Sequence, residues 1–405
     1  MSSEWAEATL GKFVRLQRGH DLTAAEQEPG NVPVMGSAGP NGTHSKSLAK
    51  GPGVVIGRSG ASAGKVHFIE VDYWPHNTCL YVTDFLGNNP RFAFYLLQML
   101  DLGTFNSGSA QPSLNRNFIY SIPLKVPDVD EQDAIVSVLQ ALDDRITLLR
   151  ETNATLEALA QALFKSWFVD FDPVRAKMAG RAPDDMDEAT AALFPDALEE
   201  TEFGLVPKGW TVQSLDEIAN YLNGLALQKF PPSGVDDLPV VKIAQLRKGD
   251  TVGADKASRS IKPEYIIQNG DVLFSWSGSL EVDIWCGGEG ALNQHLFKVT
   301  SLRHPKWFYY LWTKHHLEHF RQIAASKATT MGHIQRSHLS GAKAFVPSPE
   351  VMGSADHLLT PILDRIIAGA LQASALSELR DALLPRLISG QLRLPEAQSQ
   401  LEAAA

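Results

Sequence analysis

Two long stretches of the chain repeat apolar side chains at alternating spacings of three and four residues. From Glu131 to about Phe168 the chain contains neither proline nor glycine. The repeating positions of this stretch are Leu139, Leu142, Ile146, Leu149, Asn153, Leu156, Ala160, Leu163 and Trp167. A mean spacing of about 3.5 residues is the heptad period of a coiled-coil helix. The pattern predicts a helix of 38 residues, which would be about 57 Å long at 1.5 Å per residue.

A second stretch repeats the pattern near the end of the chain. Its apolar positions are Leu359, Ile362, Ile366, Leu376, Leu383 and Leu387, with Gly369 and Ala373 as small members and Arg380 as a charged interruption. We expect Pro361 and Pro385 to shorten this helix to roughly one turn inside each end, because proline lacks the N–H that an interior position donates.

Two long seams in one chain can bury each other as an antiparallel intramolecular coiled coil. The alternative is that each helix packs on its own domain. In the coiled coil the interface would contain Leu139, Leu142, Ile146, Leu149, Asn153, Leu156, Leu163, Ile362, Ile366, Leu376 and Leu383. A buried Asn153 would fix the register of the two helices at some cost in stability. The alternative for Asn153 is an exposed position.

Each long helix is preceded by short apolar runs that glycine, proline and asparagine interrupt. A short apolar segment opens each half, at 10–14 and at 210–219. The runs that favour strands are 54–56, 66–69, 80–82, 272–274 and 296–299. A helix led by proline follows in both halves, at 90–97 and 305–312. The sequence thus predicts an α+β fold with two similar mixed α/β domains, each followed by a long helix.

The second half of the chain repeats the first at a constant offset of 220 residues. Residues 122–127 return at 342–347, Asp144-Arg145-Ile146 returns as Asp364-Arg365-Ile366, and Leu163-Phe164 as Leu383-Leu384. Further upstream the offset changes, to 215 at Pro90 and Pro305 and 216 at Leu80 and Leu296. Such a duplication can fold into two units related by a pseudo-two-fold axis, and two-fold symmetry suits a protein that reads split DNA sites.

The repeat and the composition together divide the chain. The expected segments are a first domain at 1–128, a long helix at 129–169, a linker at 170–202, a second domain at 203–348, a second long helix at 349–390 and a tail at 391–405. We expect the acidic stretch 184–200 to be a solvated spacer.

The overall charge changes the picture only through its distribution. The chain has a net charge of −10, which by itself argues against a nucleic-acid-binding protein. Residues 129–200 carry 16 acidic and 6 basic side chains, whereas residues 1–128 carry 10 of each and residues 201–348 carry 13 acidic and 16 basic. Both domains are therefore neutral to basic, and each could present a basic face to DNA.

Composition also indicates a compartment. No run of about 18 apolar residues exists, so we expect no membrane span. The first residues lack the basic and apolar regions of a signal peptide. Cys79 and Cys286 are the two cysteines, which form neither a disulfide framework nor a metal-ligand cluster. We therefore expect a cytoplasmic protein.

Two pairs of loops carry the side chains that suit DNA. The loop 57–65 offers Arg58, Ser59, Ser62 and Lys65, and its equivalent 275–279 offers Trp276 and Ser277. Glycines allow close backbone approach, and these side chains donate to phosphate or guanine. The loop is not a nucleotide-binding P-loop, because that motif requires glycine at position 59 and serine or threonine at 66, where Val66 stands.

The second pair of loops matches residues 109–116 with 329–336. Its candidate DNA-binding side chains are Gln111, Ser113, Asn115, Arg116, Thr330, His333, Gln335 and Arg336. Asparagine and glutamine can pair with adenine, and arginine with guanine. The alternative is that these loops cap the element that follows them. His315, His316 and His319 have no counterpart in the first half, and we interpret them as a polar helix face rather than a metal site.

Three segments carry a resemblance to a known family. They are Leu163–Val174 at the end of the first long helix, Gly204–Trp210 before the second domain and Leu384–Leu392 near the end of the chain. With the order domain, helix, domain, helix, the chain resembles the specificity subunit of type I restriction-modification systems over nearly its whole length. The second long helix departs from the pattern of the first through Pro361, Pro385 and Arg380, so its length and register remain open.

The resemblance implies two target recognition domains, each reading one half of a split site on double-stranded DNA, and a helical spacer that sets the gap. It implies that two methyltransferase subunits dock on this chain and that two motor-nuclease restriction subunits join for cleavage. S-adenosylmethionine, ATP and magnesium would be used by those subunits, and this chain would bind no cofactor itself.

Two other classes of function are weighed against this one. An adenine methyltransferase of this type needs an Asn-Pro-Pro-aromatic run, and a nuclease needs a cluster of metal-binding carboxylates; the sequence contains neither. We therefore expect no catalytic residue and no metal site. A pure scaffold would not need duplicated loops rich in glycine, arginine and amides. The bases that the chain would recognise do not follow from the sequence.

Overall fold

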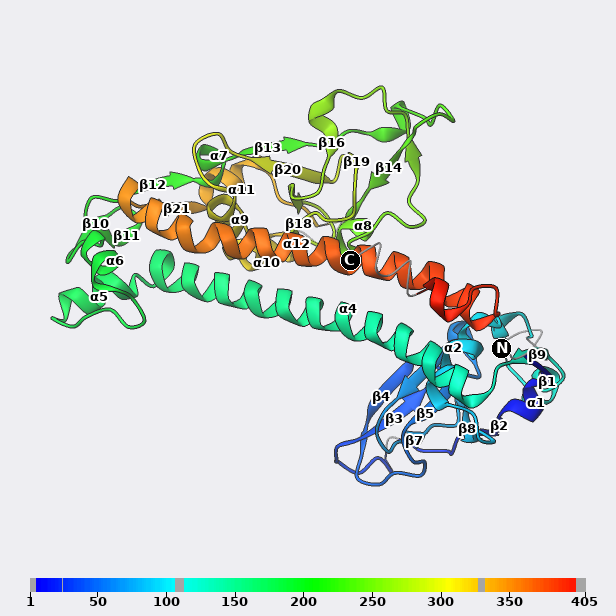
Figure 1. Cartoon of the computed structure of the whole chain (residues 1–405). Coiled ribbons are helices and arrows are strands. Elements are labelled where there is room, and N and C mark those ends of the chain that lie inside the picture. Colours follow the sequence, from blue (N-terminus) through cyan, green and yellow to red (C-terminus); the bar gives the residue numbers. More distant parts are fainter. Residues whose placement is uncertain (1–4, 24, 106–112, 327–331, 398–405) are drawn as a thin grey trace. The chain divides into compact units, whose positions relative to one another are not determined.

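The computed structural model describes residues 5–23, 25–105, 113–326 and 332–397. The chain forms two compact units. Unit 1 comprises Met1–Arg145 and Leu376–Ala405, and unit 2 comprises Ile146–Ala375. Each unit therefore combines one β-rich domain with parts of the two longest helices, α4 (Val129–Phe164) and α12 (Pro349–Ile388) (Figure 1).

Unit 1 contains a four-stranded sheet in the order β2-β8-β5-β6, a three-stranded sheet in the order β4-β3-β7 and the separate pair β1-β9. Its strands are β1 (Ala6–Thr9), β2 (Arg15–Arg18), β3 (Val32–Gly36), β4 (Gly39–His44), β5 (Gly53–Gly57), β6 (Val66–Ile69), β7 (Trp74–Pro75), β8 (Cys79–Asp84) and β9 (Pro123–Val126). Its short helices are α1 (Leu10–Phe13), α2 (Pro90–Met99) and α3 (Arg116–Ile119). Side chains of these sheets and helices share one apolar core with the first turns of α4 and the last turns of α12.

Unit 2 repeats this plan with sheets in the orders β13-β20-β17-β18 and β15-β14-β19-β16 and the pair β12-β21. Its strands are β12 (Thr211–Ser214), β13 (Asn220–Asn223), β14 (Leu238–Val241), β15 (Lys256–Ala257), β16 (Ile266–Ile267), β17 (Val272–Ser275), β18 (Val282–Ile284), β19 (Gly290–Leu292), β20 (Leu296–Thr300) and β21 (Lys343–Val346). Its helices are α7 (Leu215–Ile218), α8 (Ile243–Lys248), α9 (Lys306–His315), α10 (Leu317–Ser326) and α11 (Arg336–Gly341). In Figure 1, β12 and β21 lie beside the first turns of α12.

The strand registers align the two domains residue by residue. Gly57 pairs with Cys79 in unit 1, and Ser275 pairs with Leu296 in unit 2. These pairs make Cys79 equivalent to Leu296, an offset of 217. The offset of 216 expected at Leu80 was wrong by one residue, which would have turned every side chain of the strand to the opposite face of the sheet.

The first half of the α4 seam is buried as its heptad spacing predicts, whereas Asn153, Leu156 and Leu163 further along are only partly buried. Leu139, Leu142, Ile146 and Leu149 are each no more than 6% exposed. Asp128 begins the helix by accepting a hydrogen bond from the backbone N–H of Glu131 at 2.9 Å, which satisfies one of the free donors of the first turn. The helix continues without a break into a π-helical turn at Lys165–Val169.

In each unit, taken separately, α4 and α12 run antiparallel. In unit 1 Asp143 Oδ1 of α4 accepts from Arg380 Nη1 of α12 at 2.7 Å, and Glu131 Oε1 lies 3.1 Å from Nη1 of Arg393, which follows the end of α12. Residue numbers therefore fall along α4 as they rise along the C-terminal part of the chain. In unit 2 Asn153 Nδ2 donates to the carbonyl oxygen of Ile366 at 2.9 Å. Arg380, expected as an interruption of the seam, is thus compensated by a carboxylate of α4.

The expectation that prolines shorten the second helix was wrong. α12 is a single helix of 40 residues that contains Pro361 and Pro385. Both prolines are exposed, as are His357 and Asp381, the residues one turn earlier whose carbonyls lose a partner. Water can satisfy a carbonyl on the solvent side, so the cost of each proline is lower there than on the buried face. Gly390 follows the helix with a φ of +73°, which suits glycine at a helix end.

The segment between the first long helix and the second domain is folded rather than a solvated spacer. It contains α5 (Asp172–Met178), α6 (Glu188–Leu193) and the hairpin of β10 (Leu198–Thr201) and β11 (Gly204–Pro207). Phe194 is 2% exposed and packs edge-to-face on Trp167 at 5.2 Å. The acidic composition of 184–200 gave no sign that Phe194 is buried. Charged side chains can cover the outer surface of a segment whose few apolar side chains pack inside.

Candidate nucleic-acid interface

In unit 1 the two loops that the sequence selects for DNA lie side by side. Ser59 and Ser113 form an isolated antiparallel bridge. Next to it, the backbone N–H of Leu114 donates to the carbonyl oxygen of Arg58 at 2.8 Å. We call these adjoining segments, 58–65 and 113–116, reading cluster 1. Tertiary folding has therefore brought residues about fifty positions apart in sequence into one surface.

Unit 2 joins its loops in the same way. Ser277 and His333 form the equivalent antiparallel bridge. The N–H of Ile334 donates to the carbonyl of Trp276 at 3.0 Å, and the N–H of Gly278 donates to the carbonyl of Gly332 at 2.8 Å. We call the segments 276–279 and 332–336 reading cluster 2.

Arg58 in reading cluster 1 has its backbone fixed and its guanidinium available. Its N–H donates to the carbonyl oxygen of Thr78 at 2.9 Å and lies 3.2 Å from the hydroxyl of Ser37. Ser37 also accepts from the N–H of Ser59 at 3.2 Å. Within the described residues the guanidinium of Arg58 makes no hydrogen bond or ion pair, and Lys65 is exposed. Ser62 ends a short 3₁₀ turn, and its carbonyl accepts from the N–H of Lys65 at 3.1 Å.

Trp276 takes the position of Arg58 in reading cluster 2. Its indole N–H donates to Asn223 Oδ1 at 2.9 Å and lies 3.2 Å from the carbonyl oxygen of Gln294. Its ring contacts those of His295 and His333, with centroids 5.8 and 6.3 Å away. Ser277 is only 4% exposed and its hydroxyl lies 2.9 Å from His295 Nδ1, so this hydroxyl already has a partner inside the protein.

The amide–arginine pairs begin short helices, as the capping alternative anticipated. Asn115 accepts a hydrogen bond from the N–H of Asn117 at 3.0 Å and begins α3. Arg116 Nη1 donates to the carbonyl oxygen of Leu16 at 2.9 Å, so part of its guanidinium serves an internal contact.

The second pair is similar. The N–H of Gln335 donates to His338 Nδ1 at 2.9 Å at the start of α11, and Arg336 Nη2 donates to the carbonyl oxygen of Tyr221 at 3.2 Å. Gln111 and Thr330 lie outside the described residues.

Several side chains that support the clusters were missed by the sequence reasoning. Ser37, Asn223 and His295 come from other strands or turns and contact the loops only in the folded domain. One sequence signal was present: Gly19 and Gly224 occupy equivalent positions beside the sites. A Cβ there would lie 2.1 Å from the carbonyl oxygen of His76 in unit 1 and 2.2 Å from that of Asn293 in unit 2, and glycine alone permits such close approach.

The histidines and cysteines that could carry chemistry include three partly or fully buried side chains, His316, Cys79 and Cys286. His316 Nε2 lies 2.8 Å from the carbonyl oxygen of Lys343, and burial lowers the pKa of its imidazole to about 4. Burial raises the pKa of Cys79 to about 12 and that of Cys286 to about 11, so neither thiol is an activated nucleophile. Within the described residues no group of three or more His, Cys, Asp or Glu side chains is arranged to hold a metal.

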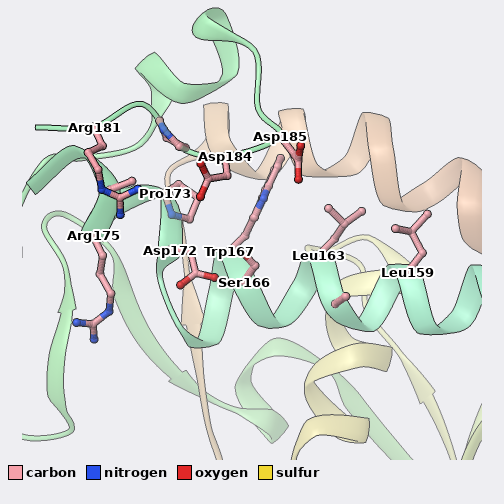
Figure 2. Close-up of a pocket in the computed structure, with 13 residues that line it drawn as sticks. Leu159, Leu163, Ser166, Trp167, Asp172, Pro173, Arg175, Arg181, Asp184 and Asp185 are labelled. Carbon is pink, nitrogen blue, oxygen red and sulfur yellow. The ribbon is translucent and has the colours of Figure 1, made fainter. Parts of the chain in front are cut away.

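Unit 2 also contains a pocket of about 500 Å³ whose lining residues differ from those of the reading clusters. Figure 2 shows Leu159 and Leu163 projecting from α4 on the side where Asp184 and Asp185 lie. Trp167, Pro173, Arg175 and Arg181 also line this pocket. No member of reading cluster 2 lines it.

Comparisons with known proteins agree with this architecture. The family model described as type I restriction modification DNA specificity domain matches residues 2–158 and 207–373. The HindI specificity subunit of Haemophilus influenzae is 26% identical over 368 residues, covering 76% of each chain. The MjaIX specificity subunit of Methanocaldococcus jannaschii is 25% identical over 327 residues, covering 76% of this chain and 70% of that protein.

Among solved structures, the S subunit of a type I restriction-modification system from M. genitalium has a similar fold. Its TM-score is 0.56 at 15% sequence identity, with 95% of this chain and 96% of that chain covered. Among the described helices, none combines the length and apolar character needed to span a bilayer. The duplicated α+β domains, the paired long helices and a family match to both halves show together that this chain belongs to the family of type I restriction-modification DNA specificity proteins.

Proposed function

We propose that the chain reads a bipartite, asymmetric site on double-stranded DNA, with one half-site for each reading cluster. The observation that carries this proposal is the pair of equivalent bridges, Ser59 to Ser113 and Ser277 to His333. The same backbone junction presents Arg58 in one domain and Trp276 in the other. Guanidinium and indole side chains make different contacts with base edges, so the two half-sites should differ in sequence.

In this proposal the domain boundaries and the DNA-contacting residues are those expected from the sequence. The recognition domains are residues 1–128 and 203–348, the spacer helices 129–169 and 349–390, the linker 170–202 and the tail 391–405. The expected DNA contacts are Arg58, Ser59, Ser62, Lys65, Gln111, Ser113, Asn115, Arg116, Trp276, Ser277, Thr330, His333, Gln335 and Arg336. Of these, Arg58, Lys65 and Trp276 are favoured by exposure or position, whereas Arg116, Arg336 and Ser277 already make internal contacts.

We further propose that the chain is the non-catalytic subunit of a larger complex. Two adenine methyltransferase subunits and two motor-nuclease subunits would assemble on it, using S-adenosylmethionine, ATP and magnesium that this chain does not bind. The named relatives are specificity subunits of type I restriction enzymes, which supports this assignment. The cytoplasm, where DNA is accessible, is the compartment that the proposal requires.

Methylation mapping with single substitutions tests the bipartite reading. The chain would be expressed with its methyltransferase partners in a host lacking other adenine methylation, and modified adenines would be sequenced. Arg58→Gln should relax or change only the first half-site, and Trp276→Leu only the second, because each side chain belongs to one cluster. Replacing one base contact should cost about 1–3 kcal/mol of discrimination at that base pair. A change in both half-sites from either substitution would contradict the proposal.

Lys50→Gln is a matched control for Arg58→Gln. It removes a cation from the same unit, but Lys50 is paired with Asp72 at 2.7 Å and belongs to neither reading cluster. Methylated sites should be unchanged in this variant. Methyl transfer by the purified chain alone would contradict its assignment as a non-catalytic subunit.

A further inference from the structure

The two reading clusters and the residues beside them differ in charge at equivalent positions. The N–H of Gly19 donates to the carbonyl of Cys79 and the N–H of Gly224 to that of Leu296, each at 3.0 Å, which aligns the residues around these glycines. The alignment places four residues of unit 1, Arg18, Asp21, Arg58 and Arg116, where unit 2 has Asn223, Ala226, Trp276 and Arg336. Three arginines and one aspartate are therefore replaced by one arginine and three uncharged residues.

In unit 2 three of these positions, Asn223, Trp276 and Arg336, form one connected group. Trp276 Nε1 donates to Asn223 Oδ1 at 2.9 Å. The ring of Phe297 lies 6.0 Å from that of Trp276, and the guanidinium of Arg336 lies 5.8 Å from the centroid of the same Phe297 ring. The side chains of Asn223, Trp276 and Arg336 therefore lie close enough to act on one ligand.

Unit 1 shows the same placement through its backbone. Arg18 pairs with Leu80 across β2 and β8, and Leu80 pairs with Ile56 across β8 and β5. Arg58 lies two residues beyond Ile56, so it follows the same row at the same end of the sheet. Arg116 reaches this edge by donating to the carbonyl of Leu16.

Arg18 is held by an acidic side chain that has no counterpart in unit 2. Its Nη2 lies 3.0 Å from Asp21 Oδ1, and the two side chains are 52% and 73% exposed. Asp21 also accepts from the side-chain amide of Asn77, and Asn77 directly precedes Thr78, whose carbonyl accepts from Arg58. Exposed ion pairs of this kind are weak, so a phosphate can compete for Arg18.

We propose that Arg18 is a phosphate-binding residue of the first half-site and that Asp21 restrains it in the free protein. The first half-site is then bound largely through charge, by Arg18 and Arg58 together. The second half-site is bound through the uncharged pair of Trp276 and Asn223. The inference rests on the proposed DNA-reading function and assigns Arg18, Asp21 and Asn223 roles in it.

The salt dependence of DNA binding tests the proposal. Binding of the full-length chain to a fluorescently labelled duplex of random sequence is measured by anisotropy over a series of KCl concentrations. Each phosphate contact contributes about −0.9 to the slope of log K against log salt. Arg18→Gln should make the slope shallower by about that amount, whereas Trp276→Phe should leave the slope unchanged.

Substitutions of Asp21 give the sharper arm, because they should improve binding. Asp21→Asn and Asp21→Ala, the latter matching Ala226, should each tighten binding about two- to five-fold at low salt and steepen the slope, by releasing Arg18. In the Arg18→Gln background the Asp21 substitutions should have a smaller effect, since no guanidinium remains to be released.

Asp72→Asn is the matched control, because it removes the same charge from the same unit at an exposed ion pair outside the reading cluster. If Asp21→Asn and Asp72→Asn change affinity and slope equally, only net charge matters and the proposal is wrong. An unchanged slope in Arg18→Gln would also overturn it. If the wild-type chain and its complex with methyltransferase partners do not bind DNA, the proposed function itself fails; DNA binding that is indifferent to Arg18 removes only this inference.

Discussion

Replacing Gly369 by alanine should destabilise unit 2, although the same change normally stabilises a helix. Gly369 is a buried interior residue of α12. A Cβ on it would lie 2.4 Å from Asn153 Oδ1 and 3.1 Å from Asn153 Cγ. Asn153 has little freedom to move away, because its Nδ2 donates to the carbonyl of Ile366 at 2.9 Å. The two helices therefore approach through a glycine that accommodates a hydrogen-bonded amide.

The magnitude follows from three opposing terms. Alanine in place of an interior helical glycine contributes about 1 kcal/mol of stability. Displacing Asn153 sacrifices a hydrogen bond worth about 1 kcal/mol, and inserting a methyl group into filled space costs about 1–3 kcal/mol. We expect Gly369→Ala to lower the free energy of unfolding by about 1–3 kcal/mol.

Gly353 provides the control in the same helix, because a Cβ there meets no atom within 4 Å. Gly353→Ala should raise the free energy of unfolding by about 0.5–1 kcal/mol. In an Asn153→Ala background, Gly369→Ala should also become stabilising, since the atom it meets is gone.

Urea unfolding followed by tryptophan fluorescence measures these changes. Six of the eight tryptophans lie in unit 2, so the signal reports mainly on that unit. If Gly369→Ala stabilises the protein as much as Gly353→Ala does, the packing argument is refuted.

Three further tests concern titratable groups that are buried or half-buried. Lys314→Met should destabilise unit 2 by about 1–3 kcal/mol, because it leaves the half-buried carboxylate of Glu157 without the ammonium group 2.7 Å away; urea unfolding checks this, and Lys314→Arg should restore part of the loss. Asp143→Asn should cost unit 1 about 1–2 kcal/mol by weakening the 2.7 Å contact with Arg380, as thermal unfolding monitored by circular dichroism at pH 7 can measure; no change in melting temperature would contradict the argument. The pKa of His316 is lowered to about 4 by burial, so the unfolded state binds a proton more readily, and stability should fall as pH decreases from about 6.5 to about 4. Unfolding at several pH values should show a weaker decrease in His316→Gln than in the wild type.

The paired helices could be anticipated because their burial follows a simple period. Leu139 and Ile146 of α4 lie one heptad apart, and each is nearly inaccessible to solvent. Proline was misjudged by the same reasoning. Its effect on a helix depends on whether the carbonyl one turn earlier faces water, and the exposed positions of Pro361 and Pro385 are set by how α12 packs.

The reading clusters could be anticipated only in part. Repetition of loops rich in glycine, arginine and amides drew attention to Arg58 and Trp276. It did not separate them from Arg116 and Arg336, whose guanidinium groups donate to strand carbonyls 100 and 115 residues away in sequence. Side-chain chemistry is the same in both roles, and only the position of the partner distinguishes them.

The sequence by itself determined the alternation of β-rich domains and long helices and the seam of α4, because periodicity and duplication can be read directly from the residue order. The family was indicated by resemblance, through short segments such as Leu163–Val174. The tertiary structure decided which loops adjoin, which arginines make internal hydrogen bonds and how the residues of the two domains correspond. It did so through backbone contacts such as the bridges at Ser59 and Ser277. Contacts between residues far apart in sequence depend on the packing of whole sheets, and no local pattern encodes them.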